Sequence, residues 1–162
     1  MIMELDRKLT LDEKVAYIKA VVENWWNTKL IKNFVEAIIT EYKLPKDDKL
    51  ELALSFAKWI KENIKFVLEP IHFNDRIRTP EATLKFRFGD CTEHSILLAC
   101  ILKFLGIDFN YVLCATNPKE PTTINHIYIE AIINGKKIPL DTTEKFRPLG
   151  QEPINFFKVR YK

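Results

Sequence analysis

FGDCTEHSILLACILKFLG, residues 88–106, is the stretch that decides the fold. Apolar residues occupy most sides of a helix that would run from Cys91 to Leu105, and Gly106 stands where helices usually end. Gly89 and Asp90 directly precede the helix. A helix that is apolar on most sides is usually buried, so this stretch predicts a central helix around which the other elements pack.

Cys91 opens this helix and is the first candidate for chemistry. Unpaired backbone N–H groups and the helix dipole favour negative charge at a helix N-terminus, so a thiol there is stabilised as the nucleophilic thiolate. The competing interpretation is a small buried cysteine, which is the commoner role of this residue type. Cys100, in mid-helix, and Cys114, in a strand-like segment, are assigned to the core.

Three strand-like segments follow the helix, at residues 109–116, 125–133 and 136–141. The last two are separated by Asn134-Gly135, which is the strongest short signal for a hairpin turn. The sequence therefore predicts an antiparallel hairpin with a two-residue turn.

The register of this hairpin places three functional side chains on one face of the sheet. Because Tyr128 faces Asp141 and alternate residues share a face, His126 lies diagonally opposite Asp141, within reach of a hydrogen bond. A carboxylate beside a histidine selects its tautomer and stabilises the imidazolium. The opposite face is apolar and sets the register: Ile127, Ile129, Ala131, Ile138 and Leu140.

A Cys–His–Asp triad results if the helix that carries Cys91 packs on the His126 face. Taken singly, His126 is also consistent with a structural histidine, and Asp141 with a carboxylate at the end of a strand. The three together, each in a suitable position, favour catalysis.

Upstream of the central helix, the chain predicts three helices and a loop. The apolar periodicity predicts helices over 11–26, from Thr28 to Leu44-Pro45, and from Asp47 or Asp48 onward. Pro70 and Pro80 predict an irregular stretch over residues 69–89, which is either a functional loop or a surface crossover. The third helix should bury Leu50, Leu54, Ala57, Trp59, Ile60 and Ile64.

Composition excludes several classes of protein. The 162 residues suit one domain, and 25 basic against 22 acidic residues give a net charge of +3, too small and too evenly spread for nucleic-acid binding. No apolar run approaches the ~18 residues of a membrane span, and the N-terminus lacks a signal-peptide core. Three cysteines without a CxxC pair argue against disulfides and for a reducing, cytoplasmic compartment.

The motifs resemble those of the transglutaminase-like superfamily, especially its small phage and viral members. The resemblance covers about residues 47–145 and lies in FGDC (88–91), NHIYIE (125–130) and PLDTT (139–143), with RTPEATL (78–84) as a lead-in. Two positions differ from the common pattern: Tyr128 replaces a frequent tryptophan, and Asp141-Thr142-Thr143 replaces Asp-Pro-Thr. Neither change removes a catalytic group.

The resemblance implies an α+β, papain-like fold in which a nucleophile helix packs on an antiparallel sheet. It implies one domain over residues 1–162, with a helical segment (1–45), a transglutaminase-like core (46–145) and a C-terminal extension (146–162). Carried over by residue, Cys91 is the nucleophile, His126 the general base and acid, and Asp141 the group that orients the imidazole.

The expected function is that of a cysteine hydrolase or acyltransferase that acts on an amide or ester of a protein or peptide substrate, without a cofactor. Peptidase, deamidase and cross-linking activity all remain open, as does the oligomeric state. The backbone N–H of Cys91 is an expected oxyanion donor. The side chains expected to contact substrate are Tyr128, Glu93, His94 and Asn74, of which Asn74 is also a candidate second oxyanion donor.

Two alternatives remain at this level. The first is a catalytically silent binding or assembly module on the same fold, because fold does not determine function. The second is a metal site made of Cys91, His94 and His126, for which only the distant His72 could be a fourth ligand.

Overall fold

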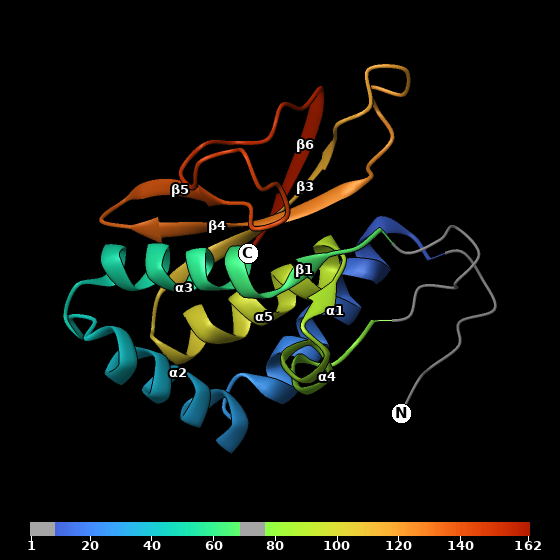
Figure 1. Ribbon diagram of the computed structural model, residues 1–162. Coiled ribbons are helices and arrows are strands. Elements are labelled where there is room, and N and C mark those ends of the chain that lie inside the picture. The colour runs from blue at the N-terminus through green and yellow to red at the C-terminus, as the bar shows by residue number, and fades with distance from the viewer. Residues whose placement is uncertain (1–8, 69–76) are drawn as a thin grey trace.

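The computed structural model describes residues 9–68 and 77–162 and shows helices packed beneath one face of an antiparallel sheet (Figure 1). This arrangement confirms the predicted α+β class. The elements in chain order are α1 (Leu11–Trp25), α2 (Lys29–Tyr42), α3 (Lys49–Asn63), β1 (Lys65–Phe66), α4 (Pro80–Phe86), β2 (Phe88–Gly89), α5 (Cys91–Phe104), β3 (Asp108–Ala115), β4 (His126–Ile133), β5 (Lys136–Leu140) and β6 (Phe157–Tyr161).

The central helix is α5, as predicted. Residues 93–102 of α5 are all buried, and the helix contacts α1, α2, α3, α4, β3 and β4. Gly106 ends it with a φ of 68°, a backbone conformation that favours glycine. The apolar residues on most sides of α5 are therefore explained by neighbours on most sides.

The main sheet has the strand order β5-β4-β3-β6, and all neighbours in it are antiparallel. Ile133 pairs with Lys136 across the turn, which confirms the predicted register. Asn134 and Gly135 have φ values of 52° and 74°, as a two-residue turn of this hand requires.

Side-chain caps begin the N-terminal helices where the sequence suggested. The hydroxyl of Thr28 accepts from the backbone N–H of Ile31, and the carboxylate of Asp48 accepts from that of Glu51. These caps satisfy N–H groups that have no partner inside the helix.

Two local predictions were wrong. The stretch 69–89 is not irregular throughout, because Pro80 begins α4 behind the N-cap Thr79 and the first position of a helix tolerates proline. Leu50 is 42% exposed, since α3 turns Leu52 and Phe56 toward the core instead. Within the C-terminal segment 146–162, β6 pairs with β3 and completes the sheet.

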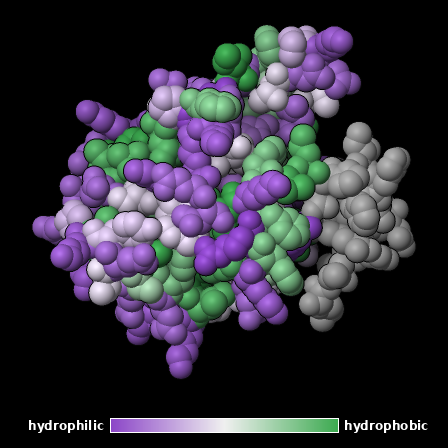
Figure 2. Space-filling view, viewed as in Figure 1, coloured by the Kyte–Doolittle hydropathy of each residue, from purple (hydrophilic) through white to green (hydrophobic). Residues whose placement is uncertain are grey.

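Figure 2 shows hydrophilic side chains over much of one face, with apolar side chains in separate areas. None of the helices in the described ranges is long and apolar enough to cross a membrane.

Candidate active site

A tight cap holds Cys91 at the first position of α5. The carboxylate of Asp90 accepts from the backbone N–H groups of Thr92 (2.8 Å) and Glu93 (3.3 Å). In return, the Glu93 carboxylate accepts from the backbone N–H of Asp90 at 2.6 Å. This reciprocal capping box fixes the backbone on both sides of Cys91, whose side chain is half-buried.

Glu93 also ties the helix start to the preceding segment. Its Oε1 accepts from the backbone N–H of Arg78 at 3.1 Å, and its Oε2 lies 3.6 Å from the Arg78 guanidinium. Burial, aided by the nearby Asp90 carboxylate, raises the pKa of Glu93 to about 8. Glu93 is therefore a buried structural anchor, and the prediction that it lies on a polar rim is wrong. That it contacts substrate stays a prediction.

Gly89 makes this anchor possible because a larger residue would collide with it. A Cβ added at Gly89 would lie 2.8 Å from the Cβ of Glu93, which is closer than side-chain carbons normally approach. We expect Gly89→Ala to lower the free energy of unfolding by about 1–3 kcal/mol through overpacking. Urea unfolding followed by circular dichroism measures the change, and an unchanged midpoint would show that the helix start can shift freely.

His126 and Asp141 form the hydrogen bond that the hairpin register predicted. The Nε2 of His126 lies 2.8 Å from Oδ2 of Asp141. The other carboxylate oxygen accepts from the backbone N–H and the hydroxyl of Thr143, at 3.0 Å and 2.7 Å. Burial opposes ionisation of Asp141, but its hydrogen bonds with His126 and Thr143 outweigh burial and lower its pKa.

Cys91 and Asp141 both interact with this histidine. Burial lowers the pKa of His126, but hydrogen bonds with the side chains of Asp141 and Cys91, together with their negative charge, raise it to about 10. Because Nε2 is engaged by Asp141, Nδ1 is the ring nitrogen left for Cys91. An imidazolium held in this way is the partner that a catalytic thiolate needs.

The route by which these groups meet differs from the one expected. α5 packs on the apolar face of the sheet, in one cluster with Ile127 and Ile129, whereas Tyr128 belongs to a separate cluster with Val112 and Cys114 on the opposite face. The condition first set for a triad, that the helix packs on the His126 face, is therefore not met. The meeting takes place at the end of the sheet, where His126 begins β4 and the Ser95 hydroxyl donates to the Ile127 carbonyl at 3.3 Å.

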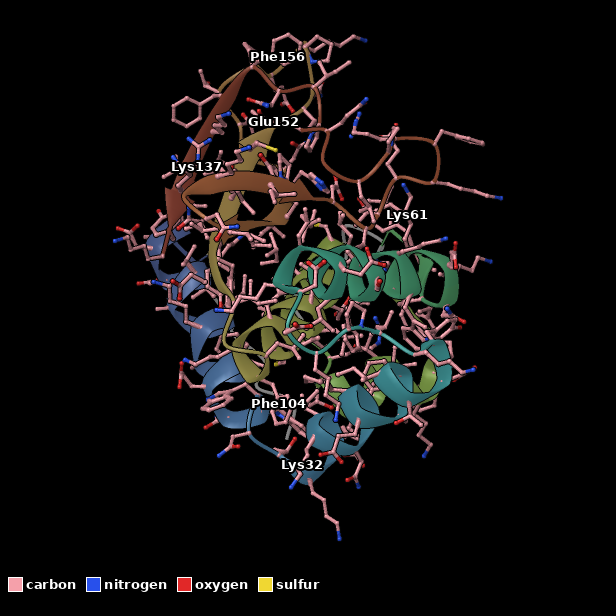
Figure 3. The ribbon with its side chains drawn as sticks, turned by 90° about the vertical axis from the view of Figure 1, so that its left-hand side faces the viewer. Lys32, Lys61, Phe104, Lys137, Glu152 and Phe156 are labelled. Atoms are coloured by element: carbon pink, nitrogen blue, oxygen red, sulfur yellow. The ribbon has the colours of Figure 1, made fainter. Side chains whose placement is uncertain are left out.

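Of the other residues expected to contact substrate, His94 and Tyr128 are buried beside the candidate triad. His94 is 1% exposed, so the prediction of a rim position is wrong; its Nδ1 lies 2.8 Å from the Thr142 hydroxyl, and burial lowers its pKa to about 4. Tyr128 is also 1% exposed; it stacks beside His126, and its hydroxyl donates to Glu152, which Figure 3 places on the segment over the outer face of the sheet. Asn74 lies outside the described residues.

Sequence reasoning missed the part that Thr142 and Thr143 play. The Thr142 hydroxyl forms a hydrogen bond with Nδ1 of the buried His94. The backbone N–H and the hydroxyl of Thr143 both donate to Asp141. The available signal was the pattern Asp141-Thr142-Thr143, because Asp and Thr side chains frequently bond to backbone groups two residues away.

The described residues do not assemble a metal site. Within residues 9–68 and 77–162, no three His, Cys, Asp or Glu side chains gather as a ligand set would. His94 bonds to Thr142, and His72 lies outside the described residues.

Comparison with known proteins gives a family and three structural neighbours. The sequence model of the transglutaminase-like superfamily matches residues 36–142, a range that begins within α2. No curated protein sequence matches the chain. A proposed cysteine protease from Cytophaga hutchinsonii aligns with a TM-score of 0.54 and 20% identity over 74% of this chain, and a proposed protease from Parabacteroides distasonis with a TM-score of 0.60 and 16% identity over 78%. A structure described as a TGase aligns over 88% with a TM-score of 0.53 and 14% identity.

At these identities the neighbours show the fold alone, which is the papain-like fold that the motifs implied. The chain spans 38%, 25% and 35% of the lengths of those three proteins. Their activities are therefore not transferred to this chain by the likeness itself.

Proposed function

This chain belongs to the transglutaminase-like superfamily, and on that premise we propose that it transfers acyl groups from an amide or ester of a protein or peptide through Cys91, His126 and Asp141. The observation that supports the proposal is one imidazole that interacts both with a thiol at a helix N-terminus and with a buried carboxylate. Each partner stabilises the charged form of the ring, which a purely structural histidine does not require.

The first half of the reaction forms an acyl-enzyme. The Cys91 thiolate attacks the carbonyl carbon, and a carbon–sulfur bond forms while negative charge develops on the oxygen. The Asp90 cap uses the N–H groups of Thr92 and Glu93, not that of Cys91, so the Cys91 N–H is the proposed oxyanion donor. The His126 imidazolium then protonates the leaving amine or alcohol as the bond to it breaks.

The second half returns the enzyme to its starting state. Water or a primary amine attacks the thioester, and His126 accepts the proton of the nucleophile. The carbon–sulfur bond breaks and the thiolate is restored beside the imidazolium. Asp141 keeps the ring oriented through both halves, because Thr143 holds the carboxylate in place.

Covalent labelling tests this proposal. We expect a panel of peptidyl vinyl sulfones and activated peptide esters to add one label per chain, at Cys91, as read by intact mass and peptide mapping. Cys100 and Cys114 should stay unmodified, because burial raises the pKa of each to about 12. Adding a fluorescent primary amine with the ester distinguishes transfer, which yields an amide of the amine, from hydrolysis. A folded sample that no probe labels would contradict the proposal and favour a silent binding module.

A further inference from the structure

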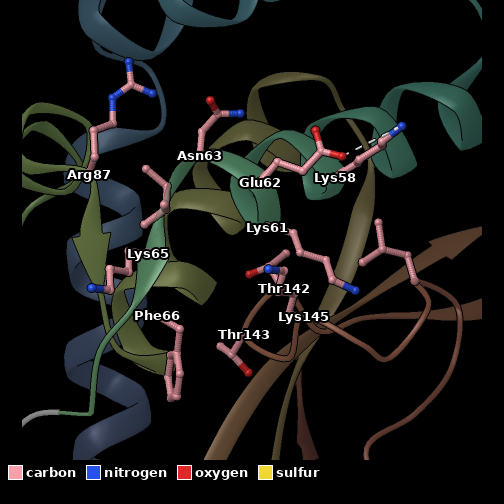
Figure 4. Close-up of a pocket in the computed structure, with 12 residues that line it drawn as sticks. Lys58, Lys61, Glu62, Asn63, Lys65, Phe66, Arg87, Thr142, Thr143 and Lys145 are labelled. Atoms are coloured by element: carbon pink, nitrogen blue, oxygen red, sulfur yellow. Dashed lines mark ion pairs between the residues drawn. The ribbon is translucent and has the colours of Figure 1, made fainter.

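A large pocket adjoins the candidate active site and plays no part in the reaction described above. It has a volume of about 950 Å³, near the upper end of the ~300–1,000 Å³ typical of ligand sites. Its walls are the C-terminal half of α3, β1, and the loop that follows β5 (Figure 4). Thr142 and Thr143 line the pocket. Because Thr142 bonds to His94 and Thr143 bonds to Asp141, the pocket adjoins the candidate site at these two threonines.

The lining of this pocket is strongly basic. It holds five cationic side chains and one carboxylate: Lys58, Lys61, Lys65, Arg87 and Lys145, with Glu62. Glu62 is already neutralised in part, since its carboxylate lies 3.9 Å from the Lys58 ammonium. The excess of positive charge is local, because the whole chain carries a net charge of only +3.

Some of these cations shape the pocket while keeping their charge. The Lys61 ammonium donates to the backbone carbonyl of Arg147 and so bridges α3 to the opposite wall. The Arg87 guanidinium lies over the Trp59 ring, 4.8 Å from its centroid. Neither contact supplies a negative charge.

Lys65 and Lys145 are the cations best placed to receive a ligand. Both are exposed, one on β1 and the other on the facing loop. Among the described residues, neither forms an ion pair with a carboxylate; Lys145 only contacts the Phe146 ring, at 6.0 Å from its centroid. Cations on both walls of an open pocket form a site for a flexible chain that carries several negative charges.

We propose that this basic pocket binds an acidic polypeptide segment, rich in Asp and Glu, next to the carbonyl group that Cys91 attacks. The inference rests on the proposed function and specifies its substrate class. A polypeptide supplies both the carboxylates that the lysines attract and the amide carbonyl that the Cys91 thiolate can attack, whereas a nucleic acid supplies no acyl group. Phe66 also lines the pocket and lies beside Thr143 in Figure 4, so it offers an apolar contact to the bound polypeptide.

Binding to the Cys91→Ala protein tests the pocket without turnover. The probe is a fluorescent peptide of alternating Glu and Gly, compared by anisotropy with the same peptide carrying Gln in place of Glu. We expect the Glu peptide to bind at least about tenfold more tightly, and more weakly as salt rises. The double substitution Lys65→Glu and Lys145→Glu should weaken binding of the Glu peptide by about tenfold or more, because two attractions become repulsions.

The matched control is the pair Lys32→Glu and Lys137→Glu, which changes net charge equally. Both lysines are exposed and lie away from Lys61 in Figure 3, on α2 and β5. We expect this pair to leave affinity within about twofold, since distant charges are screened. An equal loss of affinity in the pocket pair and the control pair, or equal binding of the Glu and Gln peptides, would overturn the proposal.

A single-stranded oligonucleotide serves as the competing polyanion. If the oligonucleotide binds more tightly than the Glu peptide, and the same pocket substitutions abolish its binding, the proposed occupant is wrong. Because these assays use protein without the nucleophile, their failure is separate from a failure of Cys91 labelling, which contradicts the proposed function.

Discussion

Replacing Cys91 with alanine should abolish formation of the acyl-enzyme and lower turnover of an activated peptide ester by at least about 10⁴-fold, because the other two thiols, Cys100 and Cys114, are buried. The fold should survive. Cys91 is half-buried at the first position of α5, and the cap that starts the helix is made by Asp90 and Glu93 instead. Ester hydrolysis and a thermal unfolding curve, measured on the same preparation, check both halves of this expectation.

Cys100→Ala is the matched control for the loss of a thiol. Cys100 is fully buried in α5, so its removal should lower the melting temperature and leave labelling at Cys91 intact. If Cys91→Ala kept wild-type ester turnover, the nucleophile would lie elsewhere and the proposed mechanism would be wrong.

Replacing His126 with alanine should change how the reactivity of Cys91 depends on pH. In the wild type, the imidazolium has a pKa of about 10, so it stays charged beside the thiol across neutral pH. At pH 6 we expect iodoacetamide to alkylate the wild-type thiol readily, because the charged imidazolium favours the nucleophilic thiolate. In the variant, the rate at pH 6 should be at least about tenfold lower and should rise more steeply with pH.

The rates are measured on protein whose fold has been checked by circular dichroism at each pH. Asp141→Asn is the companion variant, because it keeps the imidazole and removes the carboxylate that holds it. Its rate at pH 6 should fall between those of the wild type and His126→Ala. Identical pH profiles for wild type and His126→Ala would rule out a thiolate–imidazolium pair.

The same shift makes stability depend on pH with a defined sign. The pKa of His126 is higher in the folded chain than the ~6.5 of an unfolded one, so the ring favours folding while it binds its proton. That contribution is fully present below about pH 6.5 and is lost as pH rises toward about 10.

Local sequence signals succeeded where a single element decides the outcome. The buried helix from Cys91, the hairpin turn at Asn134-Gly135 and the hydrogen bond between His126 and Asp141 all depend on neighbours in one helix or one hairpin. Sequence reasoning failed for Glu93 and His94, because their polar character suggested exposure. The structure instead buries Glu93 beside Arg78 and His94 beside Thr142, on segments that are distant in sequence.

The sequence by itself determined the position of Cys91 at a helix start and the register that joins His126 to Asp141, since backbone geometry repeats every two residues in a strand and every 3.6 in a helix. Its motifs implied the α+β class through their resemblance to a family. Only the tertiary structure decided which face of the sheet covers α5, that β6 completes the sheet, and that lysines of α3, β1 and the loop after β5 line one pocket. These features depend on contacts between segments far apart in the chain. Packing selects such contacts from many possible pairings, and no local period encodes that choice.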